Sequence, residues 1–334
     1  MTLIRLKRSC FRLCCHTFNI FMKSNEKPPL VTIALPAFRQ ESYIGQAIDS
    51  LLNQTYSNLE ILISDDASPD GTFDIIKERL QGYDGNHKVI VNRNTNNLGI
   101  SHYNKIMALS SGELVVIAHG DDISMPERVA TIVSAWQETG ASLIASNAIH
   151  FIDPAITNQE EATKPWRMFD SDILPDNSLL SQAKNGRGKN IAGATLAWTR
   201  DVFDIFGDID PNRSAVTTDW ILPFRAALLN GVHYIDHPLL NIRQHHGQKF
   251  RRWIAFSENE DAYAESFFGN HLMQRHYMLD TLGLAAKKSL ISKDVYKQAS
   301  SLLVQAIILN MDKWSNIRNR LLNQNMRPVW TPIE

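Results

Sequence analysis

Between residues 30 and 146 the sequence alternates short apolar runs, rich in β-branched residues, with longer segments of helical periodicity. Parallel strands need long connections, so such alternation is typical of a parallel sheet with crossover helices. The predicted strands cover residues 30–35, 59–64, 88–91, 114–118 and 142–145. The predicted helices cover about residues 41–53, 70–81, 99–110 and 126–138. We therefore expect an α/β fold.

The rest of the chain is less regular at first and then helical. Residues 152–190 hold scattered Pro, Asn, Asp and Gly, which predicts a loop-rich excursion. An apolar run at 191–198, helices from about 201 and over 219–229, and a strand at 232–235 are expected to follow. From about residue 255 to 322 the pattern predicts two or more amphipathic helices.

Composition excludes several classes of protein. The 334-residue chain is 44% hydrophobic and 21% charged, unlike disordered, collagen-like or disulfide-scaffold proteins. Its 34 basic and 35 acidic residues give a net charge of −1, so no global positive field is available to hold nucleic acid. No run of about 18 apolar residues predicts a transmembrane helix. We expect a cytoplasmic protein, with contact at the inner face of the membrane left open.

The first 21 residues differ from the body in charge and in cysteine content. They hold no carboxylate, four basic residues and all three cysteines: Arg5, Lys7, Arg8, Arg12, Cys10, Cys14 and Cys15. Without those four, 30 basic residues face 35 acidic ones, and a cysteine-free body fits a reducing compartment. Because Met22 opens the run before the first predicted strand, two interpretations stay open. The segment is either an upstream start artefact or a short basic segment that touches anionic lipid.

Polar turns follow four of the predicted strands. In an open parallel sheet, ligands bind beyond the carboxyl ends of the strands, so these turns are expected to line one cleft. They are PAFRQE at 36–41, DDASPDG at 65–71, NRNTNNLG at 92–99 and HGDDISMP at 119–126. Each turn alone is also what ordinary turn and helix-cap chemistry uses, and that structural interpretation remains for every one of them.

The adjacent carboxylates Asp121 and Asp122 are the sharpest single feature. Two carboxylates after a buried strand repel each other unless a cation or hydrogen bonds compensate them. Hard cations such as Mg²⁺ or Mn²⁺ commonly use one or two carboxylates together with substrate phosphates. The first turn lacks both GxGxxG and GxxxxGK[ST], which argues against a dinucleotide-binding enzyme and a P-loop enzyme. The sequence therefore predicts a metal-diphosphate site.

In this order the motifs resemble those of the family 2 glycosyltransferases, which have the GT-A fold. The similar stretches are VTIALPAFRQESYIGQAIDSLLNQTYSNLEILISDDASPDGT from residue 31, then NNLG, and SSGELVVIAHGDDISMPERV from residue 110. The resemblance is strong over about 30–140 and looser to about residue 248. It implies a mixed, mainly parallel α/β sheet with flanking helices, followed here by a helical C-terminal extension.

The resemblance also implies a nucleotide site. By this similarity Ala37 and Glu41, with their neighbours Pro36 and Phe38, lie where the first loop meets the nucleoside. Asp66 matches the acidic residue that hydrogen-bonds the uracil ring. The NNLG turn, with Asn97 and Gly99, is expected to belong to the same nucleotide site.

The catalytic and metal residues follow from the same similarity. Asp121 and Asp122 match the DxD-type motif, with Asp122 as metal ligand and Asp121 nearer the ribose or the metal. Asp219 in TTDW matches the aspartate of the xED motif, the catalytic base of inverting members. His245 matches a histidine that can complete the metal or diphosphate site. The implied cofactor is a divalent cation, Mn²⁺ or Mg²⁺.

Several positions depart from the family pattern. His119 stands where the longer DxDD motif begins with aspartate, and Thr218 replaces the glutamate of xED. Asp219 precedes an apolar run, so a helix N-cap is its structural alternative. Trp220 is either a sugar-stacking wall or a core aromatic. The segment QKFRRW at 248–253 lacks the QxxRW spacing of processive synthases, which disfavours that class.

We predict inverting transfer of one sugar from a nucleotide-diphosphate donor, with UDP favoured, to a hydroxyl of a glycan or lipid-linked acceptor, as in cell-surface polysaccharide synthesis. The alternatives are a sugar nucleotidyltransferase and a noncatalytic GT-A-like binding protein. Residues 1–27 are expected to form the basic segment, 28–250 the transferase domain and 251–334 the helical extension. Within the domain, 28–146 is the predicted nucleotide-binding half and 147–250 the acceptor half. Peripheral membrane contact and the oligomeric state stay open.

Overall fold

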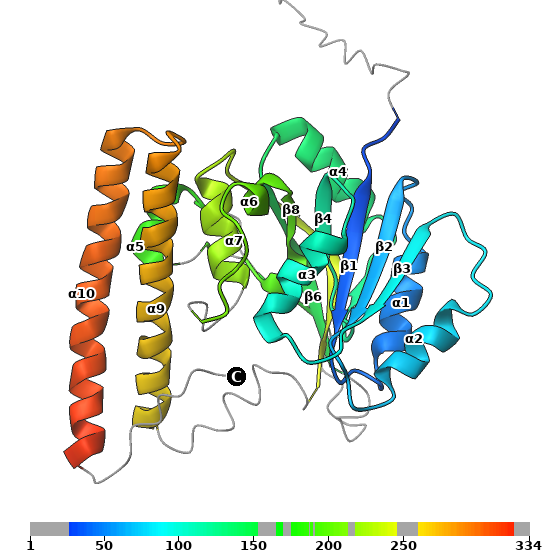
Figure 1. The fold of residues 1–334 in the computed structure, drawn as a ribbon, viewed down its shortest axis with the longest axis horizontal. Coiled ribbons are helices and arrows are strands. Elements are labelled where there is room, and N and C mark those ends of the chain that lie inside the picture. The colour runs from blue at the N-terminus through cyan, green and yellow to red at the C-terminus, as the bar shows by residue number, and fades with distance from the viewer. Residues whose placement is uncertain are drawn as a thin grey trace, which may run out of the picture.

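One mixed sheet organises the described part of the chain (Figure 1). A computed structural model describes residues 27–152, 165–169, 175–186, 188–189, 191–212, 218–245 and 260–323. The sheet order is β3-β2-β1-β4-β8-β6-β9-β5, with β7 paired to β6. The strands are β1 (Val31–Ala37), β2 (Leu59–Asp65), β3 (Lys88–Arg93), β4 (Leu114–Ile117), β5 (Ile123–Ser124), β6 (Leu143–Ile152), β7 (Trp166–Arg167), β8 (Ala197–Thr199) and β9 (Val232–Gln244).

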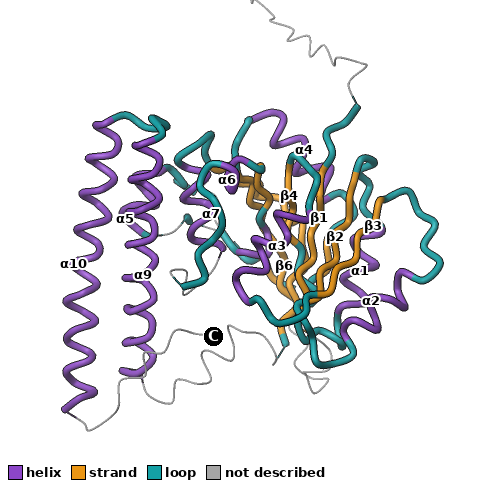
Figure 2. Tube along the Cα trace, in the orientation of Figure 1, coloured by secondary structure: helices purple, strands orange, loops and turns teal. Residues whose placement is uncertain are grey.

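Helices cover the sheet and extend beyond it (Figure 2). The α-helices are α1 (Ile44–Leu52), α2 (Thr72–Leu80), α3 (His102–Leu109), α4 (Arg128–Thr139), α5 (Leu179–Asn185), α6 (Asp201–Asp204), α7 (Thr218–Ala227), α9 (Glu260–Lys287) and α10 (Lys293–Asn323). Short 3₁₀ turns, η1 (Gly99–Ser101) and η2 (Gly193–Thr195), complete them. The long α9 and α10 lie side by side at the end of the molecule away from β1–β3.

Two hydrophobic cores lie on the two faces of the sheet. Successive strand residues point to opposite faces, so Ile33 packs with α1, α2 and α4 whereas Ala34 packs on the other side. The second core extends through Trp198, whose ring lies near Tyr103 and Phe203, to the C-terminal helices. Because β1, β2 and β4 are buried on both faces, they appear in the sequence as mainly apolar runs, interrupted in β1 and β2 by Thr32 and Glu60, which hydrogen-bond to each other.

The predicted α/β architecture is confirmed, with corrections at strand ends. The predicted strands 142–145 and 232–235 are too short, because β6 and β9 continue as a parallel pair to Ile152 and Gln244. Irregularities on both sides of Asn147 absorb the interruption at Pro238. Strands β5 and β7 and helix α5 were not predicted, since two-residue strands and a single short helix leave little periodicity.

Several predictions from the sequence concern residues or boundaries that the described fold does not test. Residues 1–26 of the predicted basic segment and the segment QKFRRW at 248–253 lie outside the described residues. The boundaries 28–146, 147–250 and 251–334 stay predictions, although strands from both predicted halves share one sheet. Among the helices that the structure describes, none combines the length and apolar character needed to cross a bilayer.

Candidate active site

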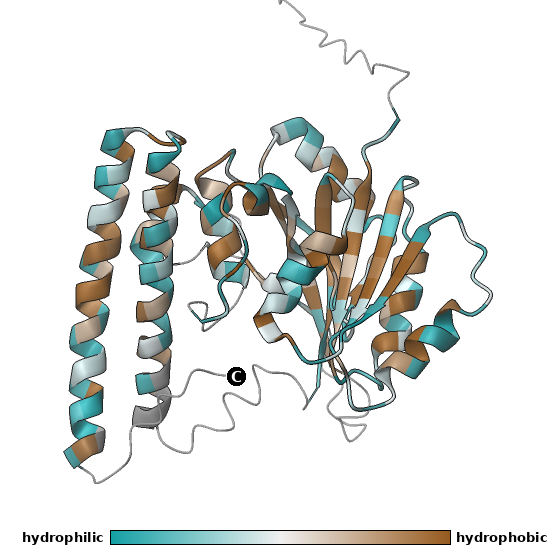
Figure 3. Cartoon of the chain, viewed as in Figure 1, coloured by the Kyte–Doolittle hydropathy of each residue, from teal (hydrophilic) through white to brown (hydrophobic). Residues whose placement is uncertain are grey.

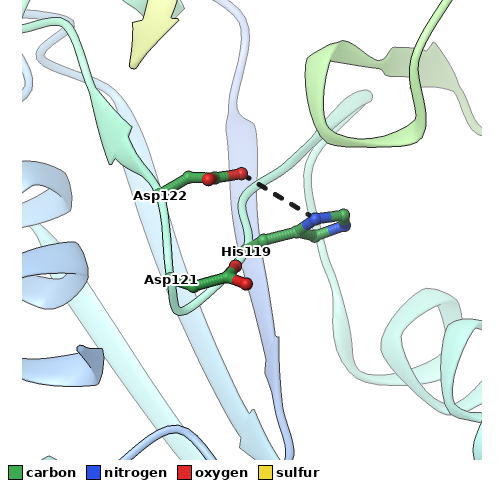
Figure 4. A group of neighbouring side chains, drawn as sticks. All are labelled: His119, Asp121 and Asp122. Carbon is green, nitrogen blue, oxygen red and sulfur yellow. Dashed lines mark ion pairs between the residues drawn. The ribbon is translucent and has the colours of Figure 1, made fainter. Parts of the chain in front are cut away.

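Three polar side chains gather on the turn between β4 and β5 (Figure 4). His119, Asp121 and Asp122 each offer a ligand atom, and these atoms all lie within 4.8 Å of one another. The His119 Nδ1 to Asp122 Oδ2 distance is 4.0 Å. A cation with ligand distances of about 2.1 Å separates its ligand atoms by about 3 to 4 Å, so small movements suffice. The donor set thus fits a divalent cation, and His119 joins the predicted carboxylates.

The turn at residue 120 packs closely against the beginning of α1. A Cβ at Gly120 would lie 2.6 Å from Ile44 Cδ1 and would also meet the Gln40 side chain. Real Cβ atoms do not approach other atoms this closely, so a larger residue at position 120 would require the ends of the Ile44 and Gln40 side chains to move. The turn that carries both carboxylates therefore lies directly against α1 and the turn before it.

The two carboxylates have opposite electrostatic environments. Burial raises the pKa of Asp122 well above its ordinary value, and the charge of Asp121 adds to this effect. A hydrogen bond from Arg243 and the charges of Arg128 and Arg243 oppose it in part. Burial also disfavours the charge of Asp121, but the hydrogen bond with His245 and the charge of His119 outweigh it and lower the pKa of Asp121. One carboxylate of the pair therefore holds its proton far more readily.

Divalent-cation affinity is accordingly expected to fall as the pH is lowered. A ligating carboxylate must be deprotonated, so the proton held by Asp122 competes with the metal. We expect about a tenfold loss of affinity per pH unit below the pKa of Asp122 in the metal-free protein. Mn²⁺ titration followed by electron paramagnetic resonance from mildly acidic to mildly alkaline pH measures this slope. An affinity that does not change with pH would contradict a carboxylate site.

Strand β9 passes over the carboxylate turn and holds it. The backbone N–H of Arg243 donates to Asp122 Oδ1 at 3.1 Å, and its Nε donates to the Asp121 carbonyl oxygen at 3.1 Å. The same guanidinium donates to Gln46 Oε1 on α1. Just after the end of β9, His245 Nε2 lies 3.1 Å from Asp121 Oδ2, and the His245 ring lies 4.4 Å from that of Tyr43. The structure thus brings His245 to the predicted site, 124 residues away in sequence.

Arg128 binds backbone carbonyl groups beside the candidate site. Its side chain is fully buried, and Nη2 donates to the carbonyl oxygens of Ile117 at 2.8 Å and Ala194 at 2.9 Å. Burial lowers the pKa of Arg128 to about 10, and the nearby charge of Asp122 opposes that shift. Because Ala194 belongs to η2, this one guanidinium joins the end of β4 to the predicted acceptor half.

Asp66 closes the neighbouring turn. Its Oδ1 accepts hydrogen bonds from Asn94 Nδ2 at 2.8 Å and from the Leu98 N–H at 2.9 Å, and Oδ2 accepts from the Gly99 N–H at 3.1 Å. A carboxylate offers about four acceptor positions, so about one remains for a ligand. Asn97 Oδ1 also accepts from the Gly99 N–H, at 2.9 Å. Asp66 therefore fixes the turn that holds Asn97 and Gly99, two of the other predicted nucleotide residues.

A buried histidine lies behind Asp66. His102 Nε2 is 2.7 Å from Ser64 Oγ, and its Nδ1 is 3.8 Å from Asp66 Oδ2. Burial lowers the pKa of His102, although the charges of Asp66 and Asp65 oppose it. A neutral ring therefore packs against the turn at neutral pH.

The first loop contributes at the end of β1. Pro36 and Ala37 are the last two residues of β1. The Ala37 carbonyl oxygen accepts a hydrogen bond from the Asp66 N–H at 2.8 Å. Phe38 is exposed beside the Arg39 guanidinium. Glu41 Oε2 accepts from the Gly71 N–H at 2.8 Å, where α2 begins. These bonds join the first two turns, and a nucleoside contact of these residues stays a prediction.

Asp219 lies in the first described turn of α7, and Trp220 beside it packs against His271 at 4.6 Å between ring centroids. Trp220 is buried, which favours the core alternative. Burial raises the pKa of Tyr103 to about 12; the Asp219 charge adds to this, and a hydrogen bond with Thr218 opposes it. Asp219 thus lies against α3, and its role as base stays a prediction.

Three positions at the candidate site were not predicted from the sequence. In the sequence His119 is only a departure from the carboxylate pattern, and no motif includes Arg128 or Arg243. For Arg128 a signal exists, because an arginine four residues after Ser124 on an otherwise apolar helix face is unusual. For Arg243 no local signal exists, since its partners lie up to 197 positions away.

The curled sheet and the polar group at the ends of its parallel strands define a GT-A-like transferase. Residues 32–194 match the model of "Glycosyl transferase family 2". This region belongs to the family 2 glycosyltransferases, as the motifs between residues 30 and 140 predicted.

Among curated relatives, the chain is similar to the putative glycosyltransferase EpsE of Bacillus subtilis, with 33% identity over 30% of this chain and 36% of that one. It is 29% identical to the GalNAc(5)-diNAcBac-PP-undecaprenol beta-1,3-glucosyltransferase of Campylobacter jejuni, over 33% of this chain and 35% of that one. The chain thus spans about a third of the length of either relative.

Solved structures share the fold. TarS 1-349 of S. aureus in complex with UDP-GlcNAc matches with a TM-score of 0.50 at 15% identity, covering 91% of this chain and 95% of that one. The mannosyltransferase PcManGT from Pyrobaculum calidifontis, in complex with GDP-Man and Mn²⁺, matches with a TM-score of 0.51 at 15% identity. It covers 89% of this chain and 76% of the other. At such identities the likeness supports the GT-A fold alone.

Proposed function

We propose that the protein transfers a single sugar from a nucleotide-diphosphate donor, with UDP favoured, to a hydroxyl of a glycan or lipid-linked acceptor, with inversion at the anomeric carbon. The observation that carries the proposal is the group formed by His119, Asp121 and Asp122, joined by His245. Oxygen and imidazole ligands at the end of a parallel strand suit a divalent cation bound together with a diphosphate.

The reaction needs stabilisation of the leaving group. As the acceptor oxygen bonds to the anomeric carbon, the bond from that carbon to the diphosphate oxygen breaks, and negative charge collects on the nucleoside diphosphate. A bound Mn²⁺ or Mg²⁺ supplies Lewis-acid stabilisation of that charge. His119, Asp121 and Asp122 would hold the ion, while Arg243 and Arg128 keep the turn in place.

The acceptor hydroxyl must also lose its proton. In the proposed mechanism the carboxylate of Asp219 takes it as general base, from the face of the sugar opposite the diphosphate. Support for this role comes from the contacts that lie between the metal turn and Asp219. Arg128 donates to Ala194 in η2, and a Cβ at Gly193 in η2 would lie 3.6 Å from Thr218 Oγ1, beside Asp219. Thr218, the neighbour of Asp219, therefore lies close to the η2 turn that Arg128 binds.

The proposal about the acceptor rests on sequence similarity. The Campylobacter jejuni relative is named as a glucosyltransferase acting on an undecaprenol diphosphate glycan. By analogy we propose a lipid-linked or free glycan acceptor for this chain, as in cell-surface polysaccharide synthesis.

The full chain incubated with a panel of UDP-sugars and GDP-mannose, with Mn²⁺ or Mg²⁺, tests the proposal. We expect slow, metal-dependent release of UDP from one donor, abolished by EDTA and accelerated by the correct acceptor. The anomeric configuration of the product, measured by nuclear magnetic resonance, tests inversion. Pyrophosphate release from a sugar phosphate and a nucleoside triphosphate would favour a nucleotidyltransferase. A folded protein that neither binds nor turns over any donor would favour a noncatalytic binding protein.

A further inference from the structure

Large hydrophobic side chains are exposed mainly on α10. Of the eleven exposed large hydrophobic residues in the described part of the chain, six lie on this helix: Tyr296, Val304, Ile308, Leu309, Met311 and Leu322. Ile308 and Met311 are 55% and 52% exposed. In Figure 3 the middle of α10 is brown at the outer edge of the molecule, away from the sheet. Such a concentration on one element marks an interaction surface.

Helix α10 has two apolar sides, and one of them is already buried within the protein. Residues at helical spacing, Ala299, Leu303, Ile307, Asn310 and Ile317, are buried, chiefly by packing with α9. A second set at the same spacing is solvent-facing in its centre, and we call it the open row. The open row consists of Lys293, Lys297, Ser300, Val304, Ile308, Met311, Ser315, Arg318 and Leu322.

The charges on the open row are all positive. Lys293 and Lys297 are exposed near its start and Arg318 lies near its end, with no carboxylate in the row. Asp294 and Asp312 are the two carboxylates of α10, and Asp312 borders the open row on the exposed side of the helix, one turn from Ile308. Over the whole helix five cations outnumber these two carboxylates: Lys293, Lys297, Lys313, Arg318 and Arg320. The apolar centre is therefore flanked by cations at both ends, over about 30 Å of helix at about 1.5 Å per residue.

We propose that the open row of α10 docks on an anionic lipid bilayer. Apolar side chains that enter the headgroup region, together with lysine and arginine beside them, are the features that hold a helix in a membrane interface. The charges also argue against a second copy of the chain as the occupant. In parallel α10–α10 packing each cation would face itself, and in antiparallel packing about Ile308 Lys297 would face the region of Arg318. Like charges repel in both arrangements.

This inference does not depend on the proposed transfer reaction, and its test needs no substrate. The full 334-residue chain is sedimented with phosphatidylcholine vesicles, with or without phosphatidylglycerol. We expect binding to the anionic vesicles, at least about tenfold weaker binding to the neutral ones, and weakening as salt is added. The double variant Ile308→Glu/Met311→Glu is expected to lose about tenfold or more of the anionic binding. Lys293→Gln/Lys297→Gln is expected to lose a smaller part.

Val91→Glu is the matched control, because Val91 is 43% exposed on β3, away from α10. It should bind vesicles like the unaltered protein, and circular dichroism should show the same helix content for all variants. Unchanged vesicle binding by Ile308→Glu/Met311→Glu would overturn the proposal and place the contact elsewhere, as on the basic segment 1–27. A dimer in light scattering that this double variant converts to a monomer would also overturn it, by making a second copy the occupant.

Discussion

Replacing Asp122 by asparagine is expected to lower the rate of sugar transfer by about a thousandfold while the fold stays intact. Asparagine keeps an oxygen that can accept the hydrogen bond that Arg243 N–H donates to Asp122 Oδ1. Only the negative charge is lost, and with it the anionic ligand for the cation. The measurement is donor hydrolysis and transfer with saturating Mn²⁺, beside the thermal midpoint of unfolding.

The same variant has an expected effect on stability that separates a metal site from a structural carboxylate. Folding raises the pKa of Asp122, so the folded metal-free protein binds a proton more tightly than the unfolded chain does. Stability therefore falls as the pH rises from the unfolded pKa through the folded one, and Asp122→Asn removes that loss. Without metal the variant should melt at the same temperature or higher at neutral pH, whereas Mn²⁺ should stabilise only the unaltered protein.

Asp74→Asn is the control, because that carboxylate lies exposed on α2. It should leave transfer and the response to Mn²⁺ unchanged. Full activity in Asp122→Asn would remove this residue from the proposed metal site. A variant that melts much lower without metal would instead make the carboxylate a structural part of the turn.

The parallel part of the fold was predictable because its physics is local. Strands β1, β2 and β4 are buried on both faces, so each appears as a mainly apolar run, and the helices between them keep their own period. The order of the remaining strands was not predictable in this way. β8 lies between β4 and β6 because Val115 pairs with Trp198, a contact between distant parts of the chain.

Some residues of the candidate site could likewise be predicted from the sequence and others could not. Asp121 and Asp122 could be found because two adjacent carboxylates after an apolar run conflict with ordinary strand chemistry. His119 required the geometry of the turn, in which residues 119 and 122 face each other. Arg243 required the course of β9, which continues beyond the predicted end at residue 235 and crosses the turn. Sequence patterns therefore locate ligands more readily than the groups that position them.

Asp219→Asn is expected to lower kcat by about a hundredfold to ten-thousandfold with little change in the KM of the donor. Asparagine cannot take a proton, but it serves at a helix N-terminus about as well as aspartate does. Loss of the charge in the first turn of α7 should cost about 0.3 to 1 kcal/mol of folding free energy. That loss is too small to explain a decrease in kcat in a protein that remains folded, so the variant separates the catalytic interpretation from the structural one.

The pH dependence of the rate gives a second readout that a structural role would not change. If Asp219 is the base, kcat/KM of the unaltered protein falls on the acid side as the carboxylate is protonated, and Asp219→Asn lacks that limb. Asp294→Asn is the matched control, since this carboxylate lies in the first turn of α10 and loses the same interaction with the helix dipole. It should retain the full rate and the acid limb. Full activity in Asp219→Asn would assign the residue to the helix terminus and require another base.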